Sequence, residues 1–166
     1  MTSENRPMRR LWAPWRMQYI GGIEQNEECF LCEAAKCDEP AEDNLVVWKD
    51  DLALCIMNRY PYNNGHLLVA PLWHEAALEQ LAADARLALF DGLVRTKGVL
   101  ERVMSPDGFN IGLNLGRAGG AGIEDHLHFH IVPRWNGDTN FMPVVAATKV
   151  IPQSLTDLYG RLKDAL

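Results

Sequence analysis

Three of the five histidines in this sequence occupy alternate positions, at His126, His128 and His130. Side chains of a β-strand point alternately to opposite faces, so a strand here would place the three imidazoles in one row, roughly 7 Å apart. The intervening face is apolar and is expected to be buried; it carries Leu127, Phe129 and Ile131. Such a row suits metal binding or chemistry at phosphorus, and a solvated strand face is the third interpretation.

The segment before the histidines favours phosphate chemistry. Gly116, Gly119, Gly120 and Gly122 would let backbone N–H groups approach an anion closely. Such a loop can hold phosphate oxygens while an imidazole attacks phosphorus, since much of a histidine is unprotonated near neutral pH. The attacking ring needs a fixed tautomer, and we expect a backbone carbonyl to accept the hydrogen bond that fixes it.

Three of the four cysteines lie close together, and two of them form a C-x-x-C pair, Cys29 and Cys32. A redox pair of this kind would sit near a βαβ pattern, which the sequence lacks. The pair is alternatively half of a zinc site, which would need two further ligands. Cys37 is expected to be a bystander, and Cys55 is expected to lie in a core strand.

The hydrophobic pattern predicts the elements that position these groups. A long helix is predicted over about 75–104, weakened by Gly92 and Gly98 and ended by "SPDG". A short C-terminal helix is predicted from Ser154 to Leu166. Strands are predicted at 45–50, 52–58, 66–71, 109–114, 126–134 and 141–146. Runs of strands around one long helix predict an α+β fold with an antiparallel sheet.

Length and composition limit the function. With 166 residues we expect a single domain over 1–166, divided into an N-terminal arm (1–28), a core (29–150) and a C-terminal helix (151–166). The net charge of -6 argues against extended nucleic acid as a partner. The sequence shows neither a membrane span nor a signal peptide, which predicts a cytoplasmic location.

The N-terminal arm is unusually apolar for a free tail. It carries Trp12, Trp15 and Tyr19 within eight residues. We expect these side chains to pack on the body of the protein or on a partner subunit.

Several segments together resemble the histidine triad (HIT) family. "HLHFHIV" fits the pattern His-φ-His-φ-His-φ-φ, in which φ is apolar. "MNRYPYNNGHLLVAP" is similar to the family's nucleoside-binding strand and turn, and "GFNIGLNLG" to the strand that enters the phosphate loop. The resemblance covers about residues 29–150. "LWAPWRMQYI" and "PRWNGDTNF" further resemble the bacterial branch that includes diadenosine tetraphosphate (Ap4A) phosphorylases.

The resemblance implies a nucleotide enzyme of the HIT fold that cleaves dinucleoside polyphosphates at the α-phosphate. His128 would be the nucleophile that takes up the nucleoside monophosphate, and His130 would contact the reacting phosphate. Phosphate or water would then release the nucleotide. Nucleotide-binding positions carried over in the same way are Asn58 (ribose), His66 (pocket), Asn114 (phosphate), Gly120 and Gly122. At Gly122 many relatives carry Gln or Ser, so the second acceptor stays open.

The resemblance also implies a structural zinc ion. In related proteins the matching Cys, Cys, His and first triad histidine bind zinc, which corresponds here to Cys29, Cys32, His74 and His126. Four such ligands make a closed tetrahedral site. The alternative is two buried thiols, with His74 capping the long helix. The chemistry itself requires no metal, although Mg²⁺ can accompany the polyphosphate.

The family forms homodimers whose sheets join edge to edge, so the same assembly is expected here. Three other functions stay open at this point. One is a purine nucleoside phosphoramidase on the same fold. The second is a module that binds nucleotides without turnover, and the third is a metalloenzyme with the three histidines as catalytic ligands.

Overall fold

The computed structural model describes residues 29–146 and 150–166. The N-terminal arm, with the predictions made for Trp12, Trp15 and Tyr19, lies outside the described residues. Five strands form one antiparallel sheet in the order β1-β2-β3-β5-β4. The predicted α+β class with an antiparallel sheet, one long helix and a short C-terminal helix is therefore confirmed.

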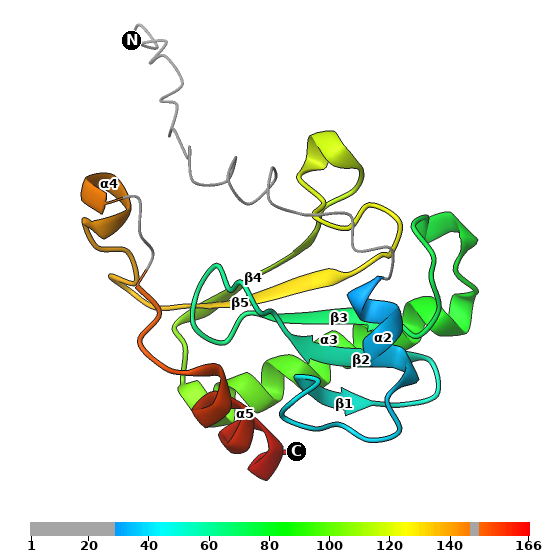
Figure 1. Ribbon diagram of the computed structural model, residues 1–166, viewed down its shortest axis with the longest axis horizontal. Helices are drawn as coiled ribbons and strands as arrows, with labels where there is room; N and C mark the ends of the chain where they lie inside the picture. The colour runs from blue at the N-terminus through cyan, green and yellow to red at the C-terminus, as the bar shows by residue number, and fades with distance from the viewer. Residues whose placement is uncertain (1–28, 147–149) are drawn as a thin grey trace, which may run out of the picture.

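The strands are β1 (Val46–Lys49), β2 (Ala53–Met57), β3 (Leu67–Pro71), β4 (Gly108–Leu113) and β5 (Phe129–Arg134). The helices are α2 (Phe30–Lys36), α3 (Ala83–Met104), α4 (Met142–Ala146) and α5 (Leu155–Asp164), with 3₁₀ turns η1 (Leu78–Gln80) and η2 (Arg117–Gly119). Figure 1 shows α2 and α3 on opposite sides of the sheet.

Alternation along the strands divides the core between the two faces of the sheet. On one face, β2 and β3 contribute Cys55 and Val69 to the larger cluster, which includes buried residues of α3. The other face carries a smaller cluster that packs on α2: Leu31, Ala34, Val46, Leu54, Ile56, Leu68 and Ala70. Leu127, Phe129 and Ile131 belong to the larger cluster, as the alternation of the histidine segment predicts.

The long helix begins later than its pattern predicts, at Ala83 instead of about residue 75. The backbone carbonyl of Glu75 accepts a hydrogen bond of 2.7 Å from the amide of Leu127, so the chain there serves the histidine segment and not a helix. Gly92 does not interrupt the helix. A Cβ at this position would lie 2.7 Å from the ring of Trp48, so the glycine allows a close approach.

One other expectation is corrected in the structure. Residues 141–146 were expected to form a strand, but 142–146 form α4. Asn140 accepts a hydrogen bond from the amide of Met142, and Pro143 lies in the first turn, where its missing N–H costs no helical bond. No element was predicted for the segment around the cysteines, where Phe30–Lys36 form α2.

The two edges of the sheet differ in their cover. Along β1, the hydroxyl of Tyr159 and the ammonium group of Lys163, both from α5, donate to the carbonyls of Val46 and Val47. Among the described residues, no strand pairs with the outer edge of β4. No helix in this part of the chain is long and apolar enough to cross a bilayer.

Candidate functional site

The three histidines divide between two groups of side chains instead of forming one row. The rings of His128 and His130 are 5.0 Å apart, whereas the ring of His126 lies 5.4 Å from that of His74. His126 and His128 precede β5, which begins at Phe129. The segment therefore supplies one site with two histidines and a neighbouring group of metal-binding type with the third.

His128 has the tautomer of a nucleophile. Its Nδ1 lies 2.8 Å from the backbone carbonyl of His126. Because a carbonyl only accepts, Nδ1 carries the hydrogen, and the lone pair of the neutral ring is on Nε2. Burial lowers the pKa of His128, while the hydrogen bond to His126 opposes this shift. The ring is therefore held neutral near pH 7, with an unprotonated nitrogen.

A chain of hydrogen bonds fixes the tautomer of His130 in the opposite sense. The backbone N–H of Tyr62 donates to Nδ1 of His66 over 3.0 Å, so the hydrogen of the neutral His66 ring is on Nε2. That nitrogen lies 2.9 Å from Nδ1 of His130, which must therefore accept. His130 consequently carries its hydrogen on Nε2. Burial, with the nearby His130 and His128, lowers the pKa of His66 to about 3.

Asn114 completes a pair of hydrogen-bond donors with His130. Its Nδ2 donates to the carbonyl of Gly120 over 3.3 Å, which orients the amide. The same nitrogen lies 3.5 Å from Nε2 of His130. Two donors cannot satisfy each other, so both N–H groups are suited to donate to one shared anion, such as a phosphate oxygen.

Several backbone groups of the glycine loop form hydrogen bonds with one another. The amides of Gly119, Gly120 and Ala121 donate to carbonyls within the loop, at Gly116 and Arg117. Gly116 and Gly120 have positive φ angles, which the turn requires. Gly122 lies half-buried before the histidine segment. The geometry thus adds His130 and Asn114 as side-chain donors for an anion, while three of the loop's amides are engaged in its turns.

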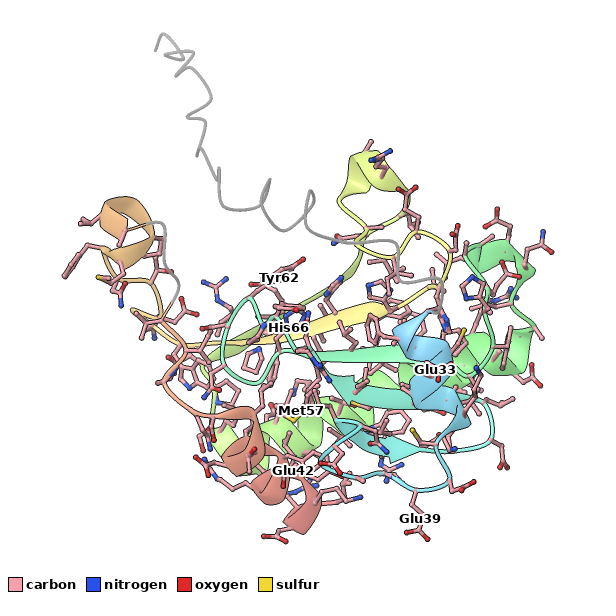
Figure 2. The ribbon with its side chains drawn as sticks, viewed as in Figure 1. Glu33, Glu39, Glu42, Met57, Tyr62 and His66 are labelled. Atoms are coloured by element: carbon pink, nitrogen blue, oxygen red, sulfur yellow. The ribbon has the colours of Figure 1, made fainter. Side chains whose placement is uncertain are left out.

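The connection between β2 and β3 forms one wall of the site. Figure 2 shows Tyr62 and His66 close together on this connection, on the side of the sheet away from α3. The ring of Tyr62 stacks at 5.6 Å on that of His130. Asn58 Nδ2 lies 3.3 Å from Nδ1 of His66, which joins the predicted ribose-binding residue to the same network.

The second group could hold a metal ion. One ligand atom from each of Cys29, Cys32, His74 and His126 lies within 4.8 Å of the other three. Cys32 Sγ is 3.2 Å from His74 Nδ1 and 3.4 Å from His126 Nδ1. Tetrahedral zinc with its usual bond lengths separates its ligand atoms by about 3.3–3.8 Å, so the donor set fits.

The second nitrogen of His126 supports this interpretation. Its Nε2 donates to the carbonyl of Pro71 over 3.0 Å, so the neutral ring presents the lone pair of Nδ1 to the cysteines. The two cysteines lie three residues apart at the start of α2, with Cys29 as its N-cap. Cys37 instead contacts the carbonyl of Glu33, and Cys55 is buried in β2, where burial raises its pKa to about 12.

Comparison with known proteins identifies the family of this chain. The HIT domain matches residues 39–137. This chain belongs to the HIT domain family. The "AP-4-A phosphorylase" of Mycobacterium tuberculosis is 38% identical over 156 residues, which cover 90% of this chain and 80% of that protein. The "Adenosine 5'-monophosphoramidase hnt1" of Schizosaccharomyces pombe is 31% identical over 108 residues, 65% of this chain and 75% of that protein.

Solved structures show the same HIT fold. A zinc-bound histidine triad family protein from Mycobacterium smegmatis superposes with a TM-score of 0.65 at 24% identity, over 84% of this chain and 93% of that chain. Its fold agrees with the sheet and helices described above. The family and the curated relatives support an enzyme that processes nucleotides.

One residue of this HIT site was not singled out from the sequence. Tyr62 contributes both its ring, against His130, and its backbone N–H, which sets the tautomer of His66. The signal in the sequence was the position of Tyr62 in "RYPYNNGH". This segment is a turn between two strands, and the turn brings the backbone of Tyr62 back toward His66. Because a backbone donor leaves no mark on residue type, the hydrogen bond itself was not predictable.

Proposed function

We propose that this HIT protein cleaves dinucleoside polyphosphates of the Ap4A type at the α-phosphate, through a nucleotidyl intermediate on His128. The observation that carries the proposal is the hydrogen bond from Nδ1 of His128 to the carbonyl of His126, which leaves the lone pair on Nε2. A buried, neutral imidazole with a fixed tautomer suits nucleophilic attack on phosphorus.

The proposed reaction has two displacements at phosphorus. In the first, a bond forms between Nε2 of His128 and the α-phosphorus as the bond from phosphorus to its bridging oxygen breaks. The leaving nucleotide departs with that electron pair, while Nδ1 keeps its hydrogen. In the second, an oxygen of phosphate or water attacks phosphorus, and the electron pair of the nitrogen–phosphorus bond returns to Nε2. An attacking water loses one proton to the solvent.

The remaining site residues support the charge that this reaction develops. The N–H groups of His130 and Asn114 are proposed to donate to the α-phosphate oxygens, where negative charge concentrates in the transition state. Asn58 is proposed to bind ribose and His66 to hold His130 in its donor tautomer. Gly120 and Gly122 are proposed to form the floor of the phosphate site.

Phosphate is the acceptor that we favour, because the M. tuberculosis relative is named AP-4-A phosphorylase. Ap4A would then give ATP and ADP. Water as acceptor would give ATP and AMP, and attack at the centre of the chain would give two molecules of ADP. Incubating the protein with Ap4A, with and without inorganic phosphate, and analysing the products distinguishes these routes.

A second candidate function is hydrolysis of adenosine 5'-phosphoramidate. The named activity of the S. pombe relative favours it, and the proposed nucleophile would act on any nucleotide with a leaving group on the α-phosphate. A faster reaction with the phosphoramidate than with Ap4A would favour this assignment. Binding of both compounds without turnover would instead indicate a nucleotide-binding module.

The covalent step is tested by replacing the nucleophile. His128→Ala should reduce turnover by several orders of magnitude, as loss of a covalent nucleophile does, while nucleotide affinity changes much less. His130→Ala should slow the reaction but still permit covalent capture. The adduct is read by mass spectrometry at neutral or alkaline pH, since a phosphoramidate hydrolyses in acid. Near-normal turnover of His128→Ala, or a label on another residue, would show the assignment to be wrong.

The cysteine–histidine group is proposed to bind structural zinc through Cys29, Cys32, His74 and His126. Its donor atoms fit a tetrahedral ion, and the M. smegmatis neighbour is a zinc-bound protein. When bound, the ion would link α2 to the histidine segment and contribute to folding. Replacement of its ligands should therefore act on stability before it acts on chemistry.

The protein is further proposed to form a homodimer through β4 and the adjacent face of α3. The ring of Phe90 contacts Phe129, and Lys97 Nζ lies over the ring of Phe109, so this part of α3 runs beside β5 and β4. Val94 of α3 and Ile111 of β4 are exposed in this region. Their exposure supports burial by a second copy.

The dimer is tested with two matched substitutions. Val94→Glu should shift the mass measured by sedimentation from dimer toward monomer. Val145→Glu, at an equally exposed valine of α4, should leave the mass unchanged. A wild-type protein that sediments as a monomer, or equal effects of both substitutions, would contradict this interface.

A further inference from the structure

The surface of the sheet that carries His130 continues along β5 and β4, and we call this surface the floor of the candidate site. Gly112 of β4 pairs with His130, and Asn110 pairs with Val132. Because alternate residues share a face, His130, Val132 and Arg134 line one side of this floor, on the face of the sheet opposite α3. The distance along the strand from His130 to Arg134 is roughly 13 Å.

Gly112 leaves space above the floor between His130 and Arg134. A Cβ built on this glycine would have no atom within 4 Å. Its neighbours on the same face of β4 are Asn114, which belongs to the phosphate-binding pair, and Asn110. The surface therefore has free space beside His130, in the direction that leads from the proposed phosphate site toward Asn110 and Arg134.

A cavity lies at the far end of this floor. It has a volume of about 310 Å³ and is lined by Tyr62, Asn63, Asn110, Val132, Arg134 and Thr139. Tyr62 also stacks on His130, so one ring contacts both the cavity and the histidines. The cavity is thus an immediate neighbour of the proposed reaction centre.

The polar groups of the cavity are held in fixed positions. Arg134 donates from Nε and Nη2 to the carboxylate of Asp138, over 2.6 and 2.9 Å, and from Nη1 to Asn110 Oδ1 over 2.7 Å. Asn63 is buried and donates to the same carboxylate and to the carbonyl of Pro133. Since Asp138 neutralises Arg134, the cavity is better suited to an uncharged polar group than to a phosphate.

We propose that this cavity binds the distal nucleoside of a dinucleoside polyphosphate, the part that departs when His128 attacks. An aromatic ring, a planar guanidinium group and side-chain amides together form the kind of surface on which proteins stack and hydrogen-bond a nucleobase. The span of the floor suits a polyphosphate chain between the two nucleosides. The inference rests on the proposed function and adds a second substrate subsite to it.

Two substrates separate this subsite from the reaction centre. Ap4A has a distal nucleoside, whereas adenosine 5'-phosphoramidate reacts at the same phosphorus without one. The measured quantity is the ratio of kcat/KM for Ap4A to kcat/KM for the phosphoramidate. Asn110→Leu removes an amide from the cavity, and Gly112→Val fills the space beside His130. Each should lower the ratio about tenfold, which corresponds to about 1.4 kcal/mol.

Gly108→Ala is the matched control, because it lies on the same face of β4, outside the cavity lining, and its added Cβ meets nothing within 4 Å. It should leave the ratio unchanged. Wild-type protein that does not cleave Ap4A would refute the proposed function and this subsite with it. Wild-type cleavage combined with an unchanged ratio in Asn110→Leu and Gly112→Val, or an equal fall in the control, would refute the subsite alone.

Discussion

The hydrogen bond between His66 and His130 is open to a direct test by two substitutions of similar size. His66→Gln keeps an acceptor for the backbone N–H of Tyr62 and a donor for Nδ1 of His130, so it should preserve the donor tautomer of His130. His66→Leu keeps neither. Nδ1 of His130 then loses its donor, and the ring is free to adopt either tautomer.

The size of the expected effect follows from the general cost of losing a preorganised donor. Deleting one preorganised donor to a developing oxyanion costs about 10²–10³ in rate. His66→Leu leaves the donor present but no longer fixed, so kcat/KM should fall roughly ten- to hundredfold. His66→Gln should stay within a factor of about ten, because it retains both hydrogen-bonding functions. In His66→Leu the backbone N–H of Tyr62 also loses the acceptor that His66 provides, which should cost about 1–3 kcal/mol of stability.

Three measurements separate this positioning role from a loss of stability. Long-range proton–nitrogen spectra should show Nδ1 of His130 unprotonated in wild-type and His66→Gln protein, and a mixture in His66→Leu. Because the pKa of His66 is about 3 in the folded protein, His66→Gln should have the wild-type pH–rate profile between pH 5 and 8. Equal kcat/KM values for the Gln and Leu variants, both correctly folded, would refute the reasoning.

Comparing wild-type protein with His66→Gln also predicts the direction in which stability changes with pH. The unfolded chain protonates His66 near its ordinary pKa of about 6.5, whereas the folded protein holds it neutral to about 3. Between these values the unfolded state binds more protons, so wild-type stability falls as the pH decreases below about 6.5. His66→Gln lacks this titration and should lose less stability over that range in urea denaturation.

Three further predictions concern stability and metal content. In thermal denaturation, Gly92→Ala should lower the free energy of unfolding by about 1–2 kcal/mol, because the added methyl group overpacks the core. Gly98→Ala is the matched control: its Cβ would make only an ordinary contact at 3.5 Å, so it should raise the free energy of unfolding by up to about 1 kcal/mol. Asp138→Asn should cost about 1–2 kcal/mol at pH 7. Its arginine partner depresses the carboxyl pKa, so the difference from wild type should shrink as the pH falls below about 4. Elemental analysis should find about one zinc per chain in wild type and in Cys37→Ser but almost none in Cys32→Ser; equal contents in the two variants would contradict the ligand set.

The alternation of residues around the histidines was enough to predict which side chains of that segment are buried. It also brought His128 and His130 together correctly, because their spacing in an extended chain is a local property. Alternation alone did not predict that His126 turns to His74, since that contact depends on where α2 and the segment after β3 lie in space; the grouping of these two histidines came from the family resemblance. The chain of hydrogen bonds from Tyr62 through His66 to His130 is also tertiary, and its first donor is a backbone group.

The differences between predicted and observed secondary structure have similar causes. α2 has only seven residues, and Cys29 makes no side-chain hydrogen bond as its N-cap, so the sequence carries no start signal for it. The apolar run at 141–146 has the composition of a strand, but Asn140 and Pro143 favour the first turn of a helix. Glu75 fits the helical period, yet its carbonyl is paired with the histidine segment.

The unequal cover of the two sheet edges sets an upper limit on assembly. In the part of the chain that the structure describes, side chains of α5 occupy carbonyls of β1, whereas no strand covers the outer edge of β4. A sheet with two free edges can add copies indefinitely and grow into a fibre. In the proposed homodimer each sheet uses its one free edge for a single partner, and a twofold axis through the paired β4 strands would close the assembly. In that assembly α5 would prevent the growth of a fibre, because it covers the second edge of each sheet.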